Sequence, residues 1–248
     1  LHYAWRLAHQ ITVIHQGMAD YLSHQLHIPP SRISVIPNGI DAARWHRRDR
    51  EQCRAALGLG PEFVFMFVGR LASVKNVPEL IRAFLAAQSS LPRPARLLIV
   101  GDGVEMAACR SLLAEHPRAE SVTLLGEQSD TRRFLAAADA LVLNSLSEGV
   151  PRALIEAMCM GLPAIATAVG GIPALLSDHG WLTRVGDPDS LTSALLEAAI
   201  HPEKAARLGE QGQAFVRSHF DYREVIPRYH DILGLSRSAA VATAASDS

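Results

Sequence analysis

Short apolar runs alternate with amphipathic stretches along most of the chain. Residues 63–69 are almost continuously apolar, as in a central strand that is covered on both faces. Residues 77–88 instead carry apolar side chains three and four positions apart, which is typical of an amphipathic helix. The predicted strands are residues 11–15, 33–37, 63–69, 96–100, 121–125, 140–144, 163–167 and 180–183. The predicted helices include residues 77–88, 104–115, 130–138, 150–160, 172–177, 190–200, 202–218 and 222–233. This alternation predicts an α/β fold with a doubly wound, Rossmann-like parallel sheet.

The composition is that of a globular protein with a sizeable core. The chain has 248 residues, 48% of them hydrophobic, which is enough for one large domain or two small ones. Its formal charge of −1 argues against a nucleic-acid-binding surface, which needs clustered excess Lys and Arg. We interpret the basic cluster at residues 44–50 as a solvated face, with a peripheral membrane contact as the alternative.

The cysteines and the hydropathy of the chain narrow its class further. Cys53, Cys109 and Cys159 are far apart and lack metal-ligand spacing, so the sequence predicts neither a disulfide framework nor a zinc site. A reducing, cytoplasmic location is therefore expected, with a contact at the inner face of the membrane as the alternative. No apolar run reaches the roughly 18 residues of a membrane span, and the first residues do not resemble a signal peptide. The chain begins without Met inside a predicted element, so we expect an upstream portion.

Polar groups follow the predicted strands at their carboxyl ends, where doubly wound sheets bind ligands. Arg70 and Lys75 follow the strand predicted at residues 63–69. A guanidinium offers a planar fork to phosphate oxygens and an ammonium group offers a mobile charge, so the pair is suited to neutralising a diphosphate without a metal. The alternative is a surface ion pair with Glu79.

Residues 148–158 carry the second set of candidate groups. Pro151 is predicted at the first position of a helix that follows a strand. Unpaired amides and the positive end of the helix dipole make the corner at residues 149–151 a predicted phosphate seat. Glu148 before the helix and Glu156 in its second turn are acceptors for sugar hydroxyls. In the alternative interpretation, Glu148 only complements the helix dipole and Glu156 belongs to a solvated face.

Two further strand ends carry weaker signals. Residues 97–103 (L-L-I-V-G-D-G) lack the third glycine of a dinucleotide fingerprint, so we interpret them as a turn that needs positive φ at Gly101 or Gly103. Residues 122–128 end another strand and offer backbone groups to the edge of a base. The eleven histidines form no H-E-x-x-H pattern, and no metal site is predicted.

Six segments, in this order and spacing, resemble the nucleotide-sugar half of glycosyltransferase family four. They are S-V-I-P-N-G-I-D (34–41), F-V-G-R-L-A-S-V-K-N (67–76), L-L-I-V-G-D-G (97–103), V-T-L-L-G-E (122–127), A-D-A-L-V-L-N-S-L-S-E-G-V-P-R-A-L-I-E-A-M (138–158) and G-L-P-A-I-A-T (161–167). The resemblance covers roughly residues 12–233. It implies the C-terminal half of a GT-B fold, with most of the N-terminal domain absent, and a retaining transferase without a metal-binding D-x-D motif.

The resemblance also implies roles for the matching residues. Arg70 and Lys75 are expected to hold the donor diphosphate and to stabilise it as the leaving group. Glu148 is expected to bind the transferred sugar, and Glu156 the ribose hydroxyls. The other expected donor-binding residues are Gly126, Glu127, Gln128, Gly149, Val150, Pro151 and Leu154. No cofactor and no metal are expected beyond the nucleoside-diphosphate sugar itself.

The resemblance divides the chain into four parts. Residues 1–28 are expected to be the last strand and helix of an acceptor domain, and residues 29–219 the donor-binding domain. Residues 220–234 form a helix expected to pack back toward the N-terminal domain, and the low-complexity residues 235–248 a disordered tail.

The expected activity is transfer of a sugar from a nucleoside diphosphate to a glycan, lipid or small-molecule acceptor. A separate N-terminal domain would supply the acceptor pocket. The alternative function is a non-catalytic nucleotide-sugar-binding module or subunit, and a sugar-nucleotide epimerase ranks last. His15 stands where the family often has Ser, and Arg152 where it often has Asn or a small residue, so donor and acceptor preference stay open.

Overall fold

The computed structural model describes residue 5, residues 7–46 and residues 48–235, and it divides into two compact units. One unit comprises residues 1–42 and 217–248, and the other comprises residues 43–216. The tail predicted to be disordered lies, from residue 236 onward, outside the described residues.

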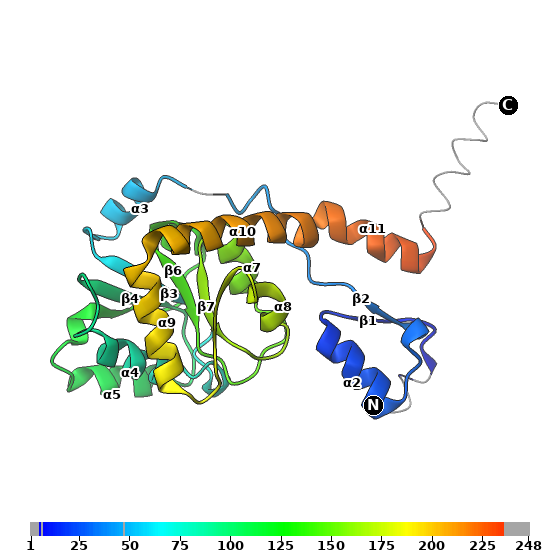
Figure 1. Ribbon diagram of the computed structural model, residues 1–248, viewed down its shortest axis with the longest axis horizontal. Coiled ribbons are helices and arrows are strands. Elements are labelled where there is room, and N and C mark those ends of the chain that lie inside the picture. The colour runs from blue at the N-terminus through cyan, green and yellow to red at the C-terminus, as the bar shows by residue number, and fades with distance from the viewer. Residues whose placement is uncertain (1–4, 6, 47, 236–248) are drawn as a thin grey trace. The chain divides into compact units, whose positions relative to one another are not determined.

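The larger unit is built on a six-stranded parallel sheet (Figure 1). Its strands are β3 (Phe63–Val68), β4 (Ala95–Val100), β5 (Val122–Leu124), β6 (Ala140–Leu143), β7 (Ala164–Thr167) and β8 (Gly180–Thr183). Their order across the sheet is β5-β4-β3-β6-β7-β8. The chain adds β4 and β5 on one side of β3 and then returns to add the last three strands on the other side. The predicted doubly wound sheet is therefore confirmed.

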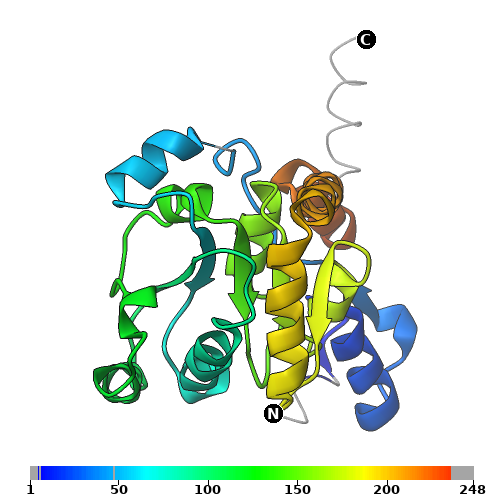
Figure 2. The same cartoon turned by 60° about the vertical axis from the view of Figure 1, so that its left-hand side comes forward.

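Helices connect and cover these strands. They are α3 (Arg50–Ala56), α4 (Val77–Ala87), α5 (Met106–Ala114), α6 (Arg132–Ala137), α7 (Arg152–Cys159), α8 (Ile172–Leu176), α9 (Pro188–Ile200) and α10 (Pro202–Phe220), with short 3₁₀ helices η2 (Ser73–Lys75) and η3 (Ala119–Ser121). Helix α4 packs against α5 and α9, and α9 runs along β7 and β8 (Figure 2). In the described part of the chain, no helix has the length and apolar character needed to cross a bilayer.

The core of this unit is centred on β3. Its Val64, Phe65, Met66 and Phe67 are completely buried, because helices cover both faces of the sheet there. The Phe65 ring meets the Phe84 ring of α4 edge to face, with the ring centroids 5.9 Å apart. The apolar run that predicted a central strand is thus the centre of the core.

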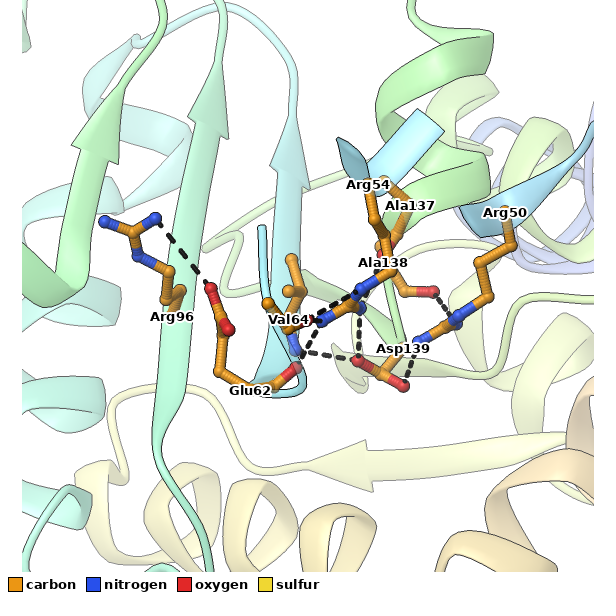
Figure 3. Close-up of polar contacts among 9 residues, drawn as sticks. Arg50, Arg54, Glu62, Val64, Arg96, Ala137, Ala138 and Asp139 are labelled. Carbon is orange, nitrogen blue, oxygen red and sulfur yellow. Dashed lines mark hydrogen bonds and ion pairs between the residues drawn. The ribbon is translucent and has the colours of Figure 1, made fainter. Parts of the chain in front are cut away.

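A network of charged side chains lies at the edge of the large sheet where its strands begin, the amino edge (Figure 3). Arg54 of α3, only 9% exposed, donates to the Ala137 carbonyl oxygen at 3.0 Å and to Asp139 Oδ2 at 3.3 Å. The same Oδ2 atom accepts from the Val64 amide at 2.8 Å, and Asp139 Oδ1 accepts from Arg50 at 2.7 Å. The network ties α3 to the residues that begin β3 and β6.

The basic cluster at residues 44–50 is therefore only partly a solvated face. Arg50 belongs to the network just described, and Arg48 forms an ion pair with Asp130 at 3.1 Å. The α3 helix that follows the cluster was not predicted. Its N-terminus is capped by Asp49, whose Oδ1 accepts from the Gln52 amide at 3.0 Å.

The smaller unit contains β1 (Ile11–Val13), α2 (Gln16–Leu26), η1 (Pro30–Arg32), β2 (Ile33–Val35) and α11 (Tyr222–Leu233). Strands β1 and β2 form a separate two-stranded parallel sheet. Strand β2 falls in the range 29–219 predicted for the donor-binding domain, but it pairs with β1 and not with the large sheet. The smaller unit has a small core of its own, made by Ile11, Val13, Ala19, Leu22 and Ile28.

The two ends of the smaller unit are joined by backbone contacts. The Ile40 amide donates to the Phe220 carbonyl at 2.7 Å, and the Tyr222 amide donates to the Ile40 carbonyl at 3.0 Å. Arg228 of α11 donates to the Val35 carbonyl at 2.5 Å. Residues 29–42 thus lie in one compact unit with residues 1–28, whereas we predicted a boundary between them. The assignment of these parts to acceptor and donor domains stays a prediction.

Candidate active site at the carboxyl edge of the sheet

Several loops meet at the carboxyl edge of the large sheet. They follow β3, β4, β5, β6 and β7, and the strand order reverses between β3 and β6, the point where doubly wound sheets bind ligands. Backbone hydrogen bonds run from Leu71 to Asp102 (2.8 Å), from Gly101 to Gly126 (2.8 Å), from Leu146 to Val74 (2.7 Å) and from Gly171 to Gly149 (2.7 Å). The loops are therefore fixed to one another before any ligand binds.

Two glycines permit this close approach. A Cβ atom on Gly101, at φ +134°, would lie 1.8 Å from the Gly69 carbonyl oxygen. A Cβ atom on Gly170, at φ +56°, would lie 1.8 Å from the Glu148 carbonyl oxygen. No side chain fits at either distance, and the positive φ predicted for the turn at Gly101 is confirmed.

Lys75 and Glu148 form an ion pair across the switch point. Lys75 ends η2 after β3, and Glu148 lies in the loop after β6. Lys75 Nζ donates to Glu148 Oε1, and Ser145 Oγ donates to the same oxygen at 2.7 Å. The Lys75 and Glu148 side chains are 22% and 10% exposed, so the pair is partly shielded from water.

The alternative partner considered for Lys75 is wrong. Lys75 pairs with Glu148, and the Glu79 carboxylate accepts from Arg82 at 3.1 Å. The alternative that Glu148 only complements the helix dipole stays an interpretation, and the structure adds that its carboxylate is paired with Lys75.

Arg70 lies at a cavity of about 320 Å³ at the ends of β3, β4 and β5. The cavity is lined by residues 68–70 and 100–102 and by Glu127, Gln128 and Thr131. The Gln128 side chain donates to the Leu125 carbonyl at 2.9 Å and accepts from Arg133 at 3.1 Å, so its orientation is fixed. The structure therefore gathers Arg70 with Glu127 and Gln128 around one cavity, and their roles in donor binding stay a prediction. The carbonyl of Gly126 is already paired with Gly101.

Helix α7 begins one residue later than predicted, because Pro151 was expected to be its first residue. Pro151 occupies the N-cap position with φ −66° and ψ 124°, and Arg152 is the first helical residue. Since proline has no N–H, only the Gly149 and Val150 amides of the predicted phosphate seat can donate.

The donor contact predicted for Leu154 is corrected to a packing role. Its side chain is fully buried, and its amide donates to the Pro151 carbonyl at 3.1 Å. Neither group is available to a ligand.

Glu156 is partly buried, so the alternative that places it on a solvated face is wrong. Its side chain is 12% exposed, and burial raises the pKa of its carboxyl group. The nearby Arg152, 3.4 Å from Glu156 Oε1, opposes this shift only weakly because its own side chain is 77% exposed. A partly desolvated carboxylate is suited to accept hydrogen bonds from ligand hydroxyls. No contact between described residues joins Glu156 to Lys75 or Arg70.

The sequence interpretation missed two buried hydroxyls at this edge. Ser145 is completely buried, and Thr167, at the end of β7, is 1% exposed. Thr167 Oγ1 donates to the Ser145 carbonyl oxygen at 2.5 Å. Both follow the rule that singled out Arg70, because both lie at the carboxyl end of a predicted strand.

Among residues 5, 7–46 and 48–235, no group of three His, Cys, Asp or Glu side chains is placed to hold a metal ion. The expectation that the reaction needs no metal stays a prediction.

Comparison with known proteins agrees with this geometry. A family model described as glycosyl transferases group 1 matches residues 49–215, and one described as glycosyltransferase family 4 matches residues 1–44. Two curated relatives are similar. The N-acetyl-alpha-D-glucosaminyl L-malate synthase of Bacillus anthracis is 29% identical over 85% of this chain and 55% of its own length. The UDP-Gal:alpha-D-GlcNAc-diphosphoundecaprenol alpha-1,3-galactosyltransferase of Escherichia coli is 31% identical over 78% of this chain and 52% of its own length.

Solved structures share the fold. Anabaena HepE in complex with UDP superposes with a TM-score of 0.84 at 25% identity, covering 93% of this chain and 65% of HepE. The chain spans about half the length of the curated relatives it matches. Since the group 1 model covers more than half of the chain, the protein belongs to the group 1 glycosyl transferases, and its large parallel-sheet unit is a family-four-type C-terminal domain of a GT-B fold.

Proposed function

We propose that this chain binds a nucleoside-diphosphate sugar at the carboxyl edge of its large sheet, for transfer of the sugar to an acceptor with retention of configuration. The observation that carries the proposal is the Lys75–Glu148 ion pair across the switch point of the sheet, together with the Arg70 cavity at the ends of β3, β4 and β5 along the same edge. This is where an anionic, hydroxyl-rich ligand finds cations, a carboxylate and backbone groups within one group of fixed loops.

The cations would act on the diphosphate. Arg70 is exposed, and its side chain has no hydrogen-bonding or ionic partner among the described residues, so its guanidinium is available to phosphate oxygens. Lys75 would add a second positive charge, and the Gly149 and Val150 amides would add donors. As the glycosidic bond breaks, negative charge grows on the leaving nucleoside diphosphate, and these fixed groups would stabilise it without a metal.

The carboxylates and the cavity would bind the rest of the donor. Glu148 would accept hydrogen bonds from the transferred sugar, and Glu156 from the ribose. The base would lie in the cavity beside Glu127 and Gln128. UDP is the first candidate, because HepE, the similar structure described above, holds UDP. The acceptor would be a glycan, a lipid or a small molecule, and a peripheral contact with a membrane is part of this proposal.

A thermal unfolding screen with UDP, GDP and ADP tests donor binding. A ligand at 100 times its Kd stabilises the folded state by about 2.7 kcal/mol, so one of the three should raise the Tm in a concentration-dependent way. The corresponding nucleoside diphosphate glucose should then bind as well. If none of the three diphosphates shifts the Tm at millimolar concentration, the proposal is wrong. Retention is checked separately, by comparing the anomeric configuration of donor and product by NMR.

A further inference from the structure

The two oxygens of the Glu148 carboxylate have different environments. Oε1 accepts from both Lys75 Nζ and Ser145 Oγ. Within the described residues, Oε2 accepts no hydrogen bond. A carboxylate with two donors on one oxygen cannot rotate freely, so its second oxygen is held in a defined position.

Ser145 is itself held from the neighbouring strand. The Thr167 hydroxyl donates to the Ser145 backbone carbonyl at 2.5 Å, and both residues are essentially inaccessible to water. A buried hydroxyl that lacks a partner is costly, so this bond fixes the backbone from which the Ser145 side chain reaches Glu148. The chain of contacts runs from the end of β7, through the loop after β6, to the carboxylate.

We propose that Ser145 and Thr167 are positioning residues that orient Glu148, so that its Oε2 atom is presented to a hydroxyl of the transferred sugar. The proposal deepens the proposed function and depends on it. It goes beyond fold stability because the hydroxyl of Ser145 contacts the one carboxylate oxygen that Lys75 also uses. Removing that hydroxyl leaves Lys75 as the sole donor, and Glu148 can then turn toward the diphosphate site with it.

The test compares the affinity for a nucleoside diphosphate with the affinity for the same diphosphate carrying glucose. Isothermal titration uses UDP and UDP-glucose. If the thermal screen selects another base, GDP with GDP-glucose or ADP with ADP-glucose replaces them. Ser145→Ala should weaken binding of UDP-glucose about tenfold, which is the effect of one hydrogen bond to a charged group. Binding of UDP should change by less than about threefold. Thr167→Val should show the same selective loss, and Thr167→Ser, which keeps the hydroxyl, should restore the wild-type affinity ratio.

A double-mutant cycle separates positioning from a purely structural role. In a Glu148→Ala background, Ser145→Ala should weaken binding of UDP-glucose by less than about twofold, because the carboxylate that Ser145 orients is gone. An equal loss in both backgrounds, or an unchanged affinity ratio in folded Ser145→Ala, would overturn the inference while leaving the proposed function intact. A wild-type chain that binds no nucleoside diphosphate would instead overturn the proposed function and this inference with it.

Discussion

Lys75 and Glu148 neutralise each other in the free protein, although both are proposed to bind the donor. The two side chains are mostly buried, so an unpaired charge at either position would be costly. A donor that brings its own diphosphate offers Lys75 a second anionic partner. The ion pair therefore keeps both side chains ordered until the ligand binds.

Substitution of Lys75 tests this role directly. Lys75→Met should weaken nucleoside diphosphate binding by about 10-fold or more, because a charge-assisted contact to phosphate is lost. Isothermal titration measures the change. Lys204→Met is the matched control, since Lys204 also donates to a glutamate, Glu197, outside the candidate site. A similar loss of affinity in both variants would contradict a specific role for Lys75.

Glu156, which is proposed to bind the donor, is a buried acid that lowers the stability of the fold at neutral pH. Burial raises the pKa of its carboxyl group above the ordinary value of 4.5, so the folded state binds this proton more tightly than the unfolded state does. The cost of burying the ionised carboxylate is fully present above the folded-state pKa. The free energy of unfolding therefore rises as the pH falls through that pKa. Below pH 4.5, where both states are protonated, the penalty is absent.

Glu156→Gln should therefore stabilise the protein at pH 7.5 and weaken donor binding. The gain in the free energy of unfolding is expected to be on the order of 1 kcal/mol, as for other substitutions that relieve an unfavourable functional group. Urea unfolding at pH 7.5 and at pH 4 measures it, and the difference between variant and wild type should shrink at the lower pH. A variant that is less stable than the wild type at pH 7.5 would refute this argument.

The secondary elements were predictable where their apolar pattern is strong. All eight predicted strands are present, and the pattern is clearest for β3, β4, β6 and β7, whose apolar runs are almost completely buried. Helix α3 was not predicted, since its one buried residue is Arg54 and a hydrophobic pattern ignores a charged residue. The pairing of β2 with β1 was not predicted either, because strand pairing depends on contacts between residues far apart in sequence. Likewise, the partners of Lys75 and Glu148 follow from loop contacts that spacing alone does not reveal.

The α3 helix is attached to the sheet through Arg54, the one buried residue of that helix. Besides Asp139, Arg54 donates to the backbone carbonyl of Gly60 at 2.5 Å. It also donates to the backbone carbonyl of Glu62 at 2.6 Å (Figure 3). A guanidinium with its five donors suits this site, because it donates to several carbonyl oxygens at once. The network lies at the amino edge of the sheet, away from the loops that would hold the donor.

Arg54→Met should accordingly reduce stability without changing the candidate site. Removing one partner of a buried ion pair costs about 3–5 kcal/mol, so the urea midpoint should fall strongly. Arg82→Met, in the exposed pair with Glu79, should change the free energy of unfolding by less than about 0.5 kcal/mol. At a temperature where Arg54→Met is still folded, its affinity for the nucleoside diphosphate should match the wild type. A stable Arg54→Met variant would show that the network contributes little.

The residues proposed to bind the donor all lie in the unit of residues 43–216, which has its own sheet and core. The group 1 family model matches residues 49–215, nearly the same range. Residues 1–42 and 217–248 form the other unit, with a small core of their own in the N-terminal part. Donor binding is therefore expected to be a property of the larger unit alone, whatever the acceptor and whatever supplies its pocket.

A fragment of residues 43–216 tests that expectation. It should unfold in one cooperative transition and bind the nucleoside diphosphate within about threefold of the full chain, because no contact proposed for the donor lies outside it. Circular dichroism and isothermal titration give the two measurements. The same fragment with Lys75→Met is the control, and it should lose binding as the full chain does. If the fragment folds cooperatively but binds more than about tenfold more weakly than the full chain, residues 1–42 or 217–248 contribute to the donor site, and the assignment of that site to the large sheet alone is wrong.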